Sequence, residues 1–375
     1  MKITKENNEI VSEKNTISRR NFFSLLGLGV APFVAKSFLT VDNIDENEDE
    51  YEDVISTNSE ECSNVRNKNL LIPPQLKKGD TVAFTAPASP ISQGSIAAYV
   101  NFFRSKGCKI LIGDTIRKQR NEHRYFAAPD EVRAAELNSM FADSDIKAII
   151  CGRGGYGIMR ILPHLNYEIL KQNPKIIMGY SDITALLLAV YRQSGLVSYH
   201  GPVASSKLYD EHKKNIENMF FNSKDKIRYS LSEMKTISEG FATGKLQGGN
   251  LSLIAATMGT PYEIDLDDAI LFIEDTNILA HEFDRMLTQL LISNKMSNCK
   301  GIIVGKIKNF TIRGNFYPNR AFTMLEVMEQ LIKPLGIPCV YNVSFGHIAS
   351  QLIFPLGINA TLNTKEKWLE VDFWG

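Results

Sequence analysis

A serine stands between an apolar run predicted as a strand and an apolar run predicted as a helix. Met178-Gly179-Tyr180 ends the first run, Ser181 and Asp182 follow, and the helix is expected over 183–191. Unpaired N–H groups at a helix N-terminus favour developing negative charge. This is the setting of a nucleophile elbow, although Thr184 stands where the second glycine of G-x-S-x-G would be. The alternative is that Ser181 or Asp182 only caps the helix.

A serine nucleophile needs a base, and histidine is the side chain that titrates near neutrality unperturbed. The chain has six histidines. His347 is the first candidate, because it lies in a turn that follows the apolar segment 338–343. His200 is the second, because it follows the last strand predicted in the first half. Each histidine taken alone is also compatible with a structural or surface role.

A base of this kind needs a third group to fix its tautomer, and a buried carboxylate is the usual choice. Glu274 and Asp275 come directly after the strongly apolar run 271–273. Two acids at the end of a buried strand either belong to a site or cap the segment that follows. Both interpretations stay open at this point.

A glycine cluster follows the third predicted strand. Its spacing satisfies G-x-G-x-x-G, the dinucleotide-binding fingerprint, through Gly152, Gly154 and Gly157. Two features weaken that interpretation: the motif does not follow the first strand, and Arg153 and Tyr156 place bulky side chains within it. Glycine is equally required where a backbone approaches a ligand closely or aims N–H groups at an oxyanion.

The elements that must position these residues alternate between strand and helix. Strands are expected over 81–84, 108–112, 146–151 and 175–178, and helices over 91–106, 130–143 and 183–191. This alternation predicts an α/β domain with a mostly parallel sheet covered on both faces. A second unit is expected, with strands over 269–273, 301–307 and 369–373 and helices over 283–292 and 322–332.

The head of the chain is similar to a twin-arginine export signal. Arg19-Arg20 precedes an apolar run over 22–35, with small residues near its end. That run is shorter than the ~20 residues that span a bilayer, so no stable membrane span is expected in the mature form. The alternative is a chance basic pair before a short buried helix. An acidic, solvated tether follows.

Bulk composition excludes several classes of protein. Lys plus Arg and Asp plus Glu number 42 each, so no global positive field favours nucleic acid. Five scattered cysteines without a CxxC pair do not predict a metal site, and no cofactor is expected. The 375 residues suffice for a head segment and two folded units.

Several ordered motifs together resemble the serine LD-carboxypeptidases, also called muramoyltetrapeptide carboxypeptidases, whose relatives include the microcin C immunity peptidases. The resemblance runs from about residue 76 to the C-terminus. Its motifs are Cys151-Gly152-Arg153-Gly154-Gly155-Tyr156-Gly157, Gly179-Tyr180-Ser181-Asp182, His200-Gly201-Pro202, Gly248-Gly249-Asn250, Ile273-Glu274-Asp275, Asp284-Arg285-Met286-Leu287 and Gly346-His347.

The resemblance implies a fold and a set of site residues. The fold is a flavodoxin-like N-terminal domain with a parallel sheet plus a smaller C-terminal α/β domain, with the site between them, usually in a homodimer. The triad carries over as Ser181, Glu274 and His347, and the oxyanion hole as the amides of Gly154 and Asp182. Other residues of these motifs are expected to contact substrate, namely Arg153, Gly155, Tyr156 and Asn250.

The implied activity is hydrolysis of an L,D-peptide bond that releases the terminal D-alanine from murein tetrapeptides. The alternatives are hydrolysis of a peptidyl-nucleotide antibiotic and, on the glycine turn alone, a dinucleotide-dependent oxidoreductase. Ile278 departs from the family, because relatives often carry an acidic residue there. The export signal predicts a periplasmic protein, with the cytoplasm as the alternative.

The predicted organisation has five segments. They are the export signal over 1–40, an acidic linker over 41–72, the nucleophile domain over 73–208, an interdomain linker over 209–240 and the C-terminal domain over 241–375.

Overall fold

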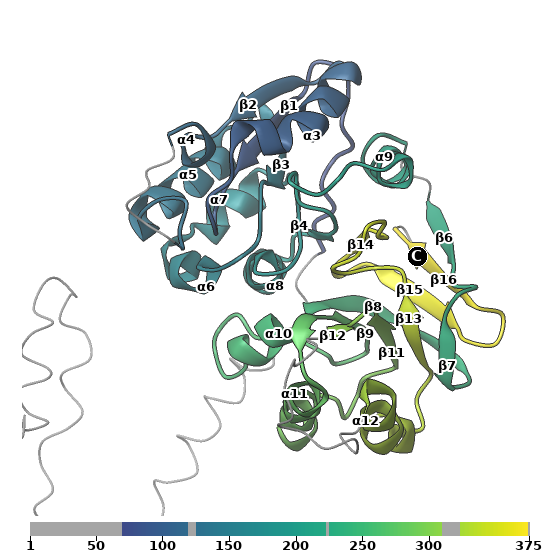
Figure 1. Cartoon of the computed structure of the whole chain (residues 1–375). Coiled ribbons are helices and arrows are strands. Elements are labelled where there is room, and N and C mark those ends of the chain that lie inside the picture. The colour runs from purple at the N-terminus through teal and green to yellow at the C-terminus, as the bar shows by residue number, and fades with distance from the viewer. Residues whose placement is uncertain (1–69, 119–124, 223–224, 310–322, 374–375) are drawn as a thin grey trace, which may run out of the picture. The chain divides into compact units, whose positions relative to one another are not determined.

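The computed structural model describes residues 70–118, 125–222, 225–309 and 323–373 (Figure 1). The predicted export signal and all but the last residues of the predicted acidic linker lie outside these ranges. Among the helices that are described, none combines the length and the apolar character needed to cross a bilayer.

The first half of the folded chain forms a sheet in the order β14-β5-β4-β3-β1-β2, in which β1 to β5 are parallel (Figure 1). Strands β1, β3, β4 and β5 are buried almost throughout, as expected for a parallel sheet covered by helices, whereas no residue of the edge strand β2 is fully buried. The strands are β1 (Thr81–Thr85), β2 (Lys109–Ile112), β3 (Ile146–Cys151), β4 (Ile176–Gly179) and β5 (Tyr199–His200). The helices are α3 (Gln93–Ser105), α4 (Asp114–Arg117), α5 (Asp130–Ala142), α6 (Ile158–Ile161), η3 (Leu162–His164), α7 (Tyr167–Gln172) and α8 (Ile183–Ser194).

The second half is built on another sheet, in the order β6-β16-β15-β8-β9-β11-β13-β7. Its strands are β6 (Lys226–Ser230), β7 (Lys235–Ser238), β8 (Phe241–Asn250), β9 (Ala269–Glu274), β11 (Gly301–Gly305), β13 (Cys339–Val343), β15 (Asn359–Asn363) and β16 (Trp368–Asp372). The four strands β8, β9, β11 and β13 are parallel to one another. Their carboxyl ends therefore meet at one edge of the sheet.

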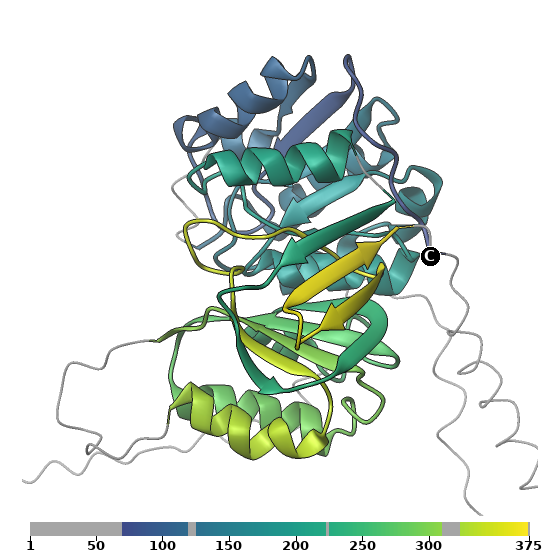
Figure 2. The same ribbon diagram turned by 90° about the vertical axis from the view of Figure 1, so that its right-hand side faces the viewer.

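Helices and short elements complete the second half. Helices α11 (Ala280–Ile292) and α12 (Met324–Leu331) lie side by side against one face of the sheet (Figures 1 and 2). The other elements are α9 (Asp210–Ile216), η4 (Glu217–Phe221), α10 (Leu251–Thr257), β10 (Thr276–Ile278), β12 (Lys308–Asn309), η5 (Lys333–Leu335) and β14 (Phe354–Pro355).

Two features differ from the sequence-based expectation. The segment 209–240, predicted as a linker, carries α9, η4, β6 and β7, and β6 and β7 form the two edges of the second sheet. Edge strands tolerate polar and charged side chains, so this segment lacks the apolar run that marks a buried strand. In addition, β14 pairs antiparallel with β5, so the C-terminal part of the chain completes the first sheet.

A buried arginine holds the glycine turn of the first half in place. The Arg133 side chain is fully buried, and its guanidinium donates to the carbonyl oxygens of Pro87 at 2.5 Å, Ala128 at 3.0 Å and Gly157 at 3.0 Å. It also pairs with the Asp130 carboxylate. Because all of these partners lie in loops or at a helix start, the arginine cross-links the segments around the turn.

We expect the substitution Arg133→Ala to lower the free energy of unfolding by about 3 kcal/mol, because it leaves buried carbonyl groups unpaired and opens a cavity. Urea denaturation followed by circular dichroism measures the change. Arg104→Ala, at an exposed arginine on α3, is the matched control and should change stability by less than about 0.5 kcal/mol. Equal stability of the two variants would contradict this role of Arg133.

Candidate active site

Ser181 occupies a strained turn between β4 and α8. Its φ of 64° lies in the left-handed region, which a non-glycine residue adopts only where the surrounding structure holds it. The Thr184 amide donates to the Ser181 carbonyl at 2.9 Å, so the helix begins directly after the serine. The turn therefore holds the serine at the carboxyl edge of the first sheet, and the side chain is only partly buried.

The glycine turn after β3 lies against this serine. A Cβ atom added to Gly154 would lie 2.8 Å from the Ser181 Cβ and 3.1 Å from its Oγ. The close contact with the serine is therefore sufficient reason for glycine at this position. In the described part of the chain, the amides of Gly154 and Asp182 donate to no protein acceptor. Two such amides beside a serine hydroxyl are the elements of an oxyanion hole.

The Asp182 side chain has a structural contact of its own. It is buried and accepts a hydrogen bond from the Ile158 amide at 2.9 Å, so it ties the start of α6 to the start of α8. Burial raises the pKa of Asp182, against the opposing effects of that hydrogen bond and of the Arg133 charge. The carboxylate does not cap its own helix.

The second half contributes a carboxylate and an imidazole that are hydrogen-bonded to each other. Nδ1 of His347 lies 2.7 Å from Oε2 of Glu274, which is fully buried at the end of β9. Burial alone would raise the pKa of Glu274. The hydrogen bond and charge of His347, with smaller effects from His200 and Asn250, outweigh burial and lower it. An ionised Glu274 holds the proton on Nδ1 and leaves Nε2 of His347 able to accept one.

A glycine allows this pair to form. Gly346 has a φ of 97°, and a Cβ atom there would lie 2.6 Å from Oε2 of Glu274. The loop that carries His347 therefore passes directly over the carboxylate.

Tyr180 brings the two halves of the site together. Its ring lies 4.8 Å from the His347 ring, centroid to centroid, and it directly precedes Ser181. Within the described residues no hydrogen bond joins the Ser181 hydroxyl to His347. Catalytic hydrogen bonds are often long before substrate binds, so this geometry is compatible with a triad. No role for Tyr180 follows from the sequence, because only its place in the motif distinguishes it.

Asn250, which is predicted to contact substrate, lies against the carboxylates of Glu274 and Asp275. Its side chain is buried, and Nδ2 donates to Oδ1 of Asp275 at 3.1 Å and to Oε1 of Glu274 at 3.4 Å. Its Oδ1 accepts from the Leu253 amide and caps α10. Because these bonds tie the side-chain amide to both carboxylates, Asn250 is placed to hold Glu274 in position, and its contact with substrate stays a prediction.

A contact between the two halves fixes the nucleophile helix. The Asn250 amide donates to Oγ1 of Thr184 at 3.0 Å. Gly249 has a φ of 140°, and a Cβ atom there would lie 2.5 Å from the Thr184 side chain. Helix α8 thus packs against the carboxyl end of β8, one strand away from Glu274.

The other predicted substrate contacts are exposed. Arg153 and Gly155 flank Gly154, and Tyr156 keeps 55% of its surface exposed. The Tyr156 ring stacks on Phe126 at 5.6 Å. Among the described residues, no hydrogen bond or ring contact joins these side chains to Ser181, Glu274 or His347.

The second candidate base, His200, does not share the geometry of His347. It is fully buried beneath Tyr180, with its ring 5.4 Å from that of Phe272. Neither ring nitrogen has a hydrogen-bond partner among the described residues. Burial lowers its pKa to about 4; the charge of Glu274 opposes this and that of His347 adds to it. His200 is therefore a neutral core residue at physiological pH.

Both halves of the chain are similar to known proteins. Family models described as the LD-carboxypeptidase N-terminal domain and the LD-carboxypeptidase C-terminal domain match residues 82–201 and 243–362. A protein named probable murein peptide carboxypeptidase, from Bacillus subtilis, is 35% identical over 80% of this chain and 94% of its own length.

Two solved structures are similar over most of their length. One is an MccF-like protein from Bacillus anthracis, with 28% identity, a TM-score of 0.71, and coverage of 81% of this chain and 99% of its own. The other is a muramoyltetrapeptide carboxypeptidase from Oxalobacter formigenes, with 25% identity, a TM-score of 0.69, and coverage of 78% and 98%.

The fold and the site thus define a serine hydrolase built on two α/β halves, which confirms the predicted fold class. The chain belongs to the LD-carboxypeptidase family of serine peptidases, as its resemblance in sequence implied.

Because His200 is buried and neutral, we expect the free energy of unfolding to fall in acid. An unfolded histidine, with a pKa near 6.5, binds a proton before the folded one does, so stability falls as the pH drops from about 6.5 towards about 4. Between about pH 8 and about pH 5, the free energy of unfolding of the wild type should fall by about 2 kcal/mol more than that of His200→Phe.

Urea denaturation at the two pH values measures this difference. Any effect of the substitution that does not depend on pH cancels when the two values are subtracted. His164→Asn, at an exposed histidine, is the control and should follow the wild type. The same pH dependence in wild type and His200→Phe would show that His200 is not held neutral.

Proposed function

We propose that this protein hydrolyses the L,D-peptide bond before the terminal D-alanine of murein tetrapeptide stems. Ser181 is the nucleophile, His347 the general base and Glu274 the residue that orients the base. The observation that carries this proposal is the 2.7 Å bond between His347 and a buried, ionised Glu274, next to a serine in a strained turn. The 35% identity to the murein peptide carboxypeptidase from Bacillus subtilis supports the substrate.

The proposed reaction has two halves. Oγ of Ser181 attacks the carbonyl carbon before D-alanine as Nε2 of His347 takes the hydroxyl proton. The amides of Gly154 and Asp182 donate to the oxyanion. The C–N bond then breaks, and the imidazolium returns its proton to the departing amine of D-alanine. Water attacks the acyl-enzyme by the same route, and the shortened peptide leaves with a new carboxylate.

Three exposed residues beside the oxyanion amides are proposed to bind substrate. Arg153 offers a guanidinium next to Gly154, where the free carboxylate of the terminal D-alanine would lie; such a pair is a charge-assisted contact. Gly155 leaves room for the peptide, and Tyr156 supplies an aromatic face. Asn250 acts on the reaction through Glu274.

A second candidate substrate is a peptidyl nucleotide, because the chain is also similar to the microcin C7 self-immunity protein MccF from Escherichia coli, a protein solved in complex with aspartyl sulfamoyl adenosine. The same serine, base and oxyanion hole would cut its amide bond. Incubation with an aminoacyl sulfamoyl adenosine separates the two substrates, since a murein enzyme should leave it intact.

The head of the chain and the assembly state complete the proposal. We propose that residues 1–40 direct export by the twin-arginine route, that residues 41–72 tether the folded part, and that the mature protein works as a periplasmic homodimer. The supports are the sequence pattern and the resemblance to the family. A single-chain mass in sedimentation equilibrium at micromolar concentration would contradict the dimer.

Removal of the nucleophile should abolish turnover without unfolding the protein. We expect Ser181→Ala to lower D-alanine release from a tetrapeptide stem by about 10⁴-fold or more. Glu274→Gln should lower it by a similar factor, because the imidazole of His347 is then no longer held in the tautomer that accepts a proton at Nε2. D-alanine release is measured by mass spectrometry, with circular dichroism as the check on folding. Ser105→Ala, on the exposed side of α3, should keep wild-type activity. Near-normal turnover by folded Ser181→Ala would refute the assignment.

Export should depend on the arginine pair. In bacterial cells the full-length chain should reach the periplasm, whereas a variant carrying both Arg19→Lys and Arg20→Lys should stay in the cytoplasm. Cell fractionation and immunoblotting measure the distribution. Arg66→Lys, outside the signal, is the control. Equal export of all three proteins would exclude the twin-arginine route.

A further inference from the structure

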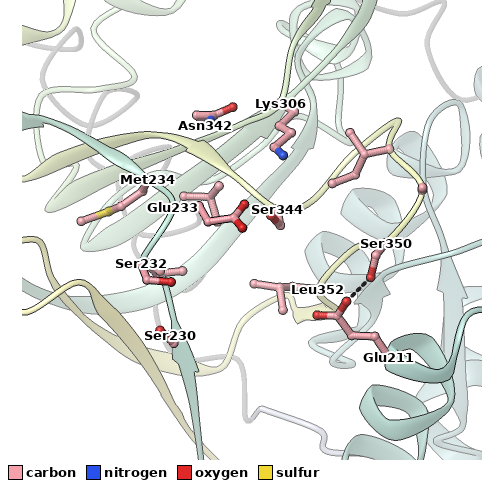
Figure 3. A pocket seen from close by; sticks show the side chains of 14 residues that line it. Glu211, Ser230, Ser232, Glu233, Met234, Lys306, Asn342, Ser344, Ser350 and Leu352 are labelled. Carbon is pink, nitrogen blue, oxygen red and sulfur yellow. Dashed lines mark hydrogen bonds between the residues drawn. The ribbon is translucent and has the colours of Figure 1, made fainter.

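A cavity of about 450 Å³ lies beside the loop that carries His347 (Figure 3). Ser344 lines it from the chain just before His347, and Ile348 lines it from the chain just after. Its volume is in the range of small-molecule sites. The lining does not include Ser181, Glu274 or His347 themselves, so it is a space next to the catalytic residues.

Sheet topology places this cavity at the edge that bears the catalytic carboxylate. Strand β9 ends in Glu274, β11 pairs with it in parallel, and Lys306 follows β11 directly. Strand β13, parallel to β11, leads into Ser344 and then His347. Adjacent strands are about 4.8 Å apart, so the backbone of Lys306 lies about one strand spacing to the side of the end of β9, where Glu274 stands. Ligands of α/β proteins bind at such carboxyl edges.

The cavity presents charges of both signs. Lys306 is half-buried and projects its ammonium into the cavity, and the exposed Glu233 reaches in from the turn between β6 and β7 (Figure 3). Within the described residues, neither side chain makes an ion pair or a hydrogen bond. Glu211 also lines the cavity, but the Ser350 hydroxyl donates to it. An unpaired cation and an unpaired carboxylate thus face one space.

A half-buried ammonium has lost part of its hydration, and without an acceptor it gains nothing in return. A ligand carboxylate would offset this cost by a charge-assisted hydrogen bond. The same argument applies in reverse to Glu233 and a ligand ammonium. A ligand carrying only an ammonium would meet Lys306 as a like charge, and one carrying only a carboxylate would meet Glu233. A group with both charges on one carbon satisfies both residues.

We propose that this cavity is a subsite for a zwitterionic arm of the acyl part of the substrate, that is, a side chain ending in both an ammonium and a carboxylate. Lys306 binds the carboxylate, and Glu233 binds the ammonium. The inference rests on the proposed function, because it assumes that the acyl part of a murein stem extends along the His347 loop. It makes Lys306 and Glu233 the residues that determine specificity for the third residue of the stem.

Three tetrapeptide stems test the subsite, with meso-diaminopimelate, its side-chain amide, or L-lysine as the third residue. We expect the wild-type kcat/KM to be about tenfold higher for the diaminopimelate stem than for either of the others, as befits one charge-assisted contact. Lys306→Met should remove this preference, and Glu233→Gln should weaken use of the diaminopimelate stem. Lys333→Met, in η5 before β13 and therefore at the opposite edge of the sheet, is the matched control and should keep the preference.

Binding of the tripeptide products, measured by calorimetry, gives a readout that does not need turnover. The diaminopimelate tripeptide should bind wild type about tenfold more tightly than the lysine tripeptide, and Lys306→Met should bind the two alike. Equal binding of both tripeptides to the wild type would overturn the subsite, even if D-alanine is released normally. Absence of D-alanine release from every stem, with the binding preference intact, would instead refute the proposed function and retain the subsite.

Discussion

The site depends on one interaction, the hydrogen bond between a fully buried carboxylate and an imidazole supplied by a loop from another strand. A buried Glu274 without compensation would be protonated, because desolvation disfavours the charged form. The His347 ring and the Asn250 amide supply the compensation, and the pKa of Glu274 is lowered as a result. Glu274 is therefore ionised despite its burial and can hold the imidazole of His347 in one tautomer.

Close backbone approach is the second constraint, and glycine meets it at three places. Gly154 lets its turn contact Ser181, Gly346 lets the histidine loop cross Glu274, and Gly249 lets β8 contact Thr184 on the nucleophile helix. Each of these contacts joins segments that are far apart in the chain. Backbone packing thus positions both the serine turn and the histidine loop, and the ring of Tyr180, the residue before Ser181, lies 4.8 Å from the His347 ring.

The sequence was most informative where the chain is buried. Apolar runs predicted β3 and β9 within one residue of their observed bounds, because strands buried on both faces leave a continuous apolar signal. The same signal is missing from the edge strands β6 and β7, so the sequence predicts a linker where these strands lie. Pairing of β14 with β5 could not be foreseen, since two residues carry no periodicity. The hydrogen bonds from Asn250 to Glu274 and Asp275 could not be predicted either, because spacing says nothing of which way a side chain faces. The cavity beside Lys306 had no sequence signal, because it arises from segments brought together only by the sheet.

The central claim is that Ser181, His347 and Glu274 act as one unit facing the amides of Gly154 and Asp182. A crystal structure of the protein after reaction with a phosphonate that mimics the tetrahedral intermediate tests it most directly. The account predicts phosphorus bonded to Oγ of Ser181, one phosphonyl oxygen within hydrogen-bonding distance of both amides, and Nε2 of His347 close to Oγ with the Glu274 bond retained. A phosphonate attached elsewhere, or an imidazole turned away from a labelled Ser181, would contradict it.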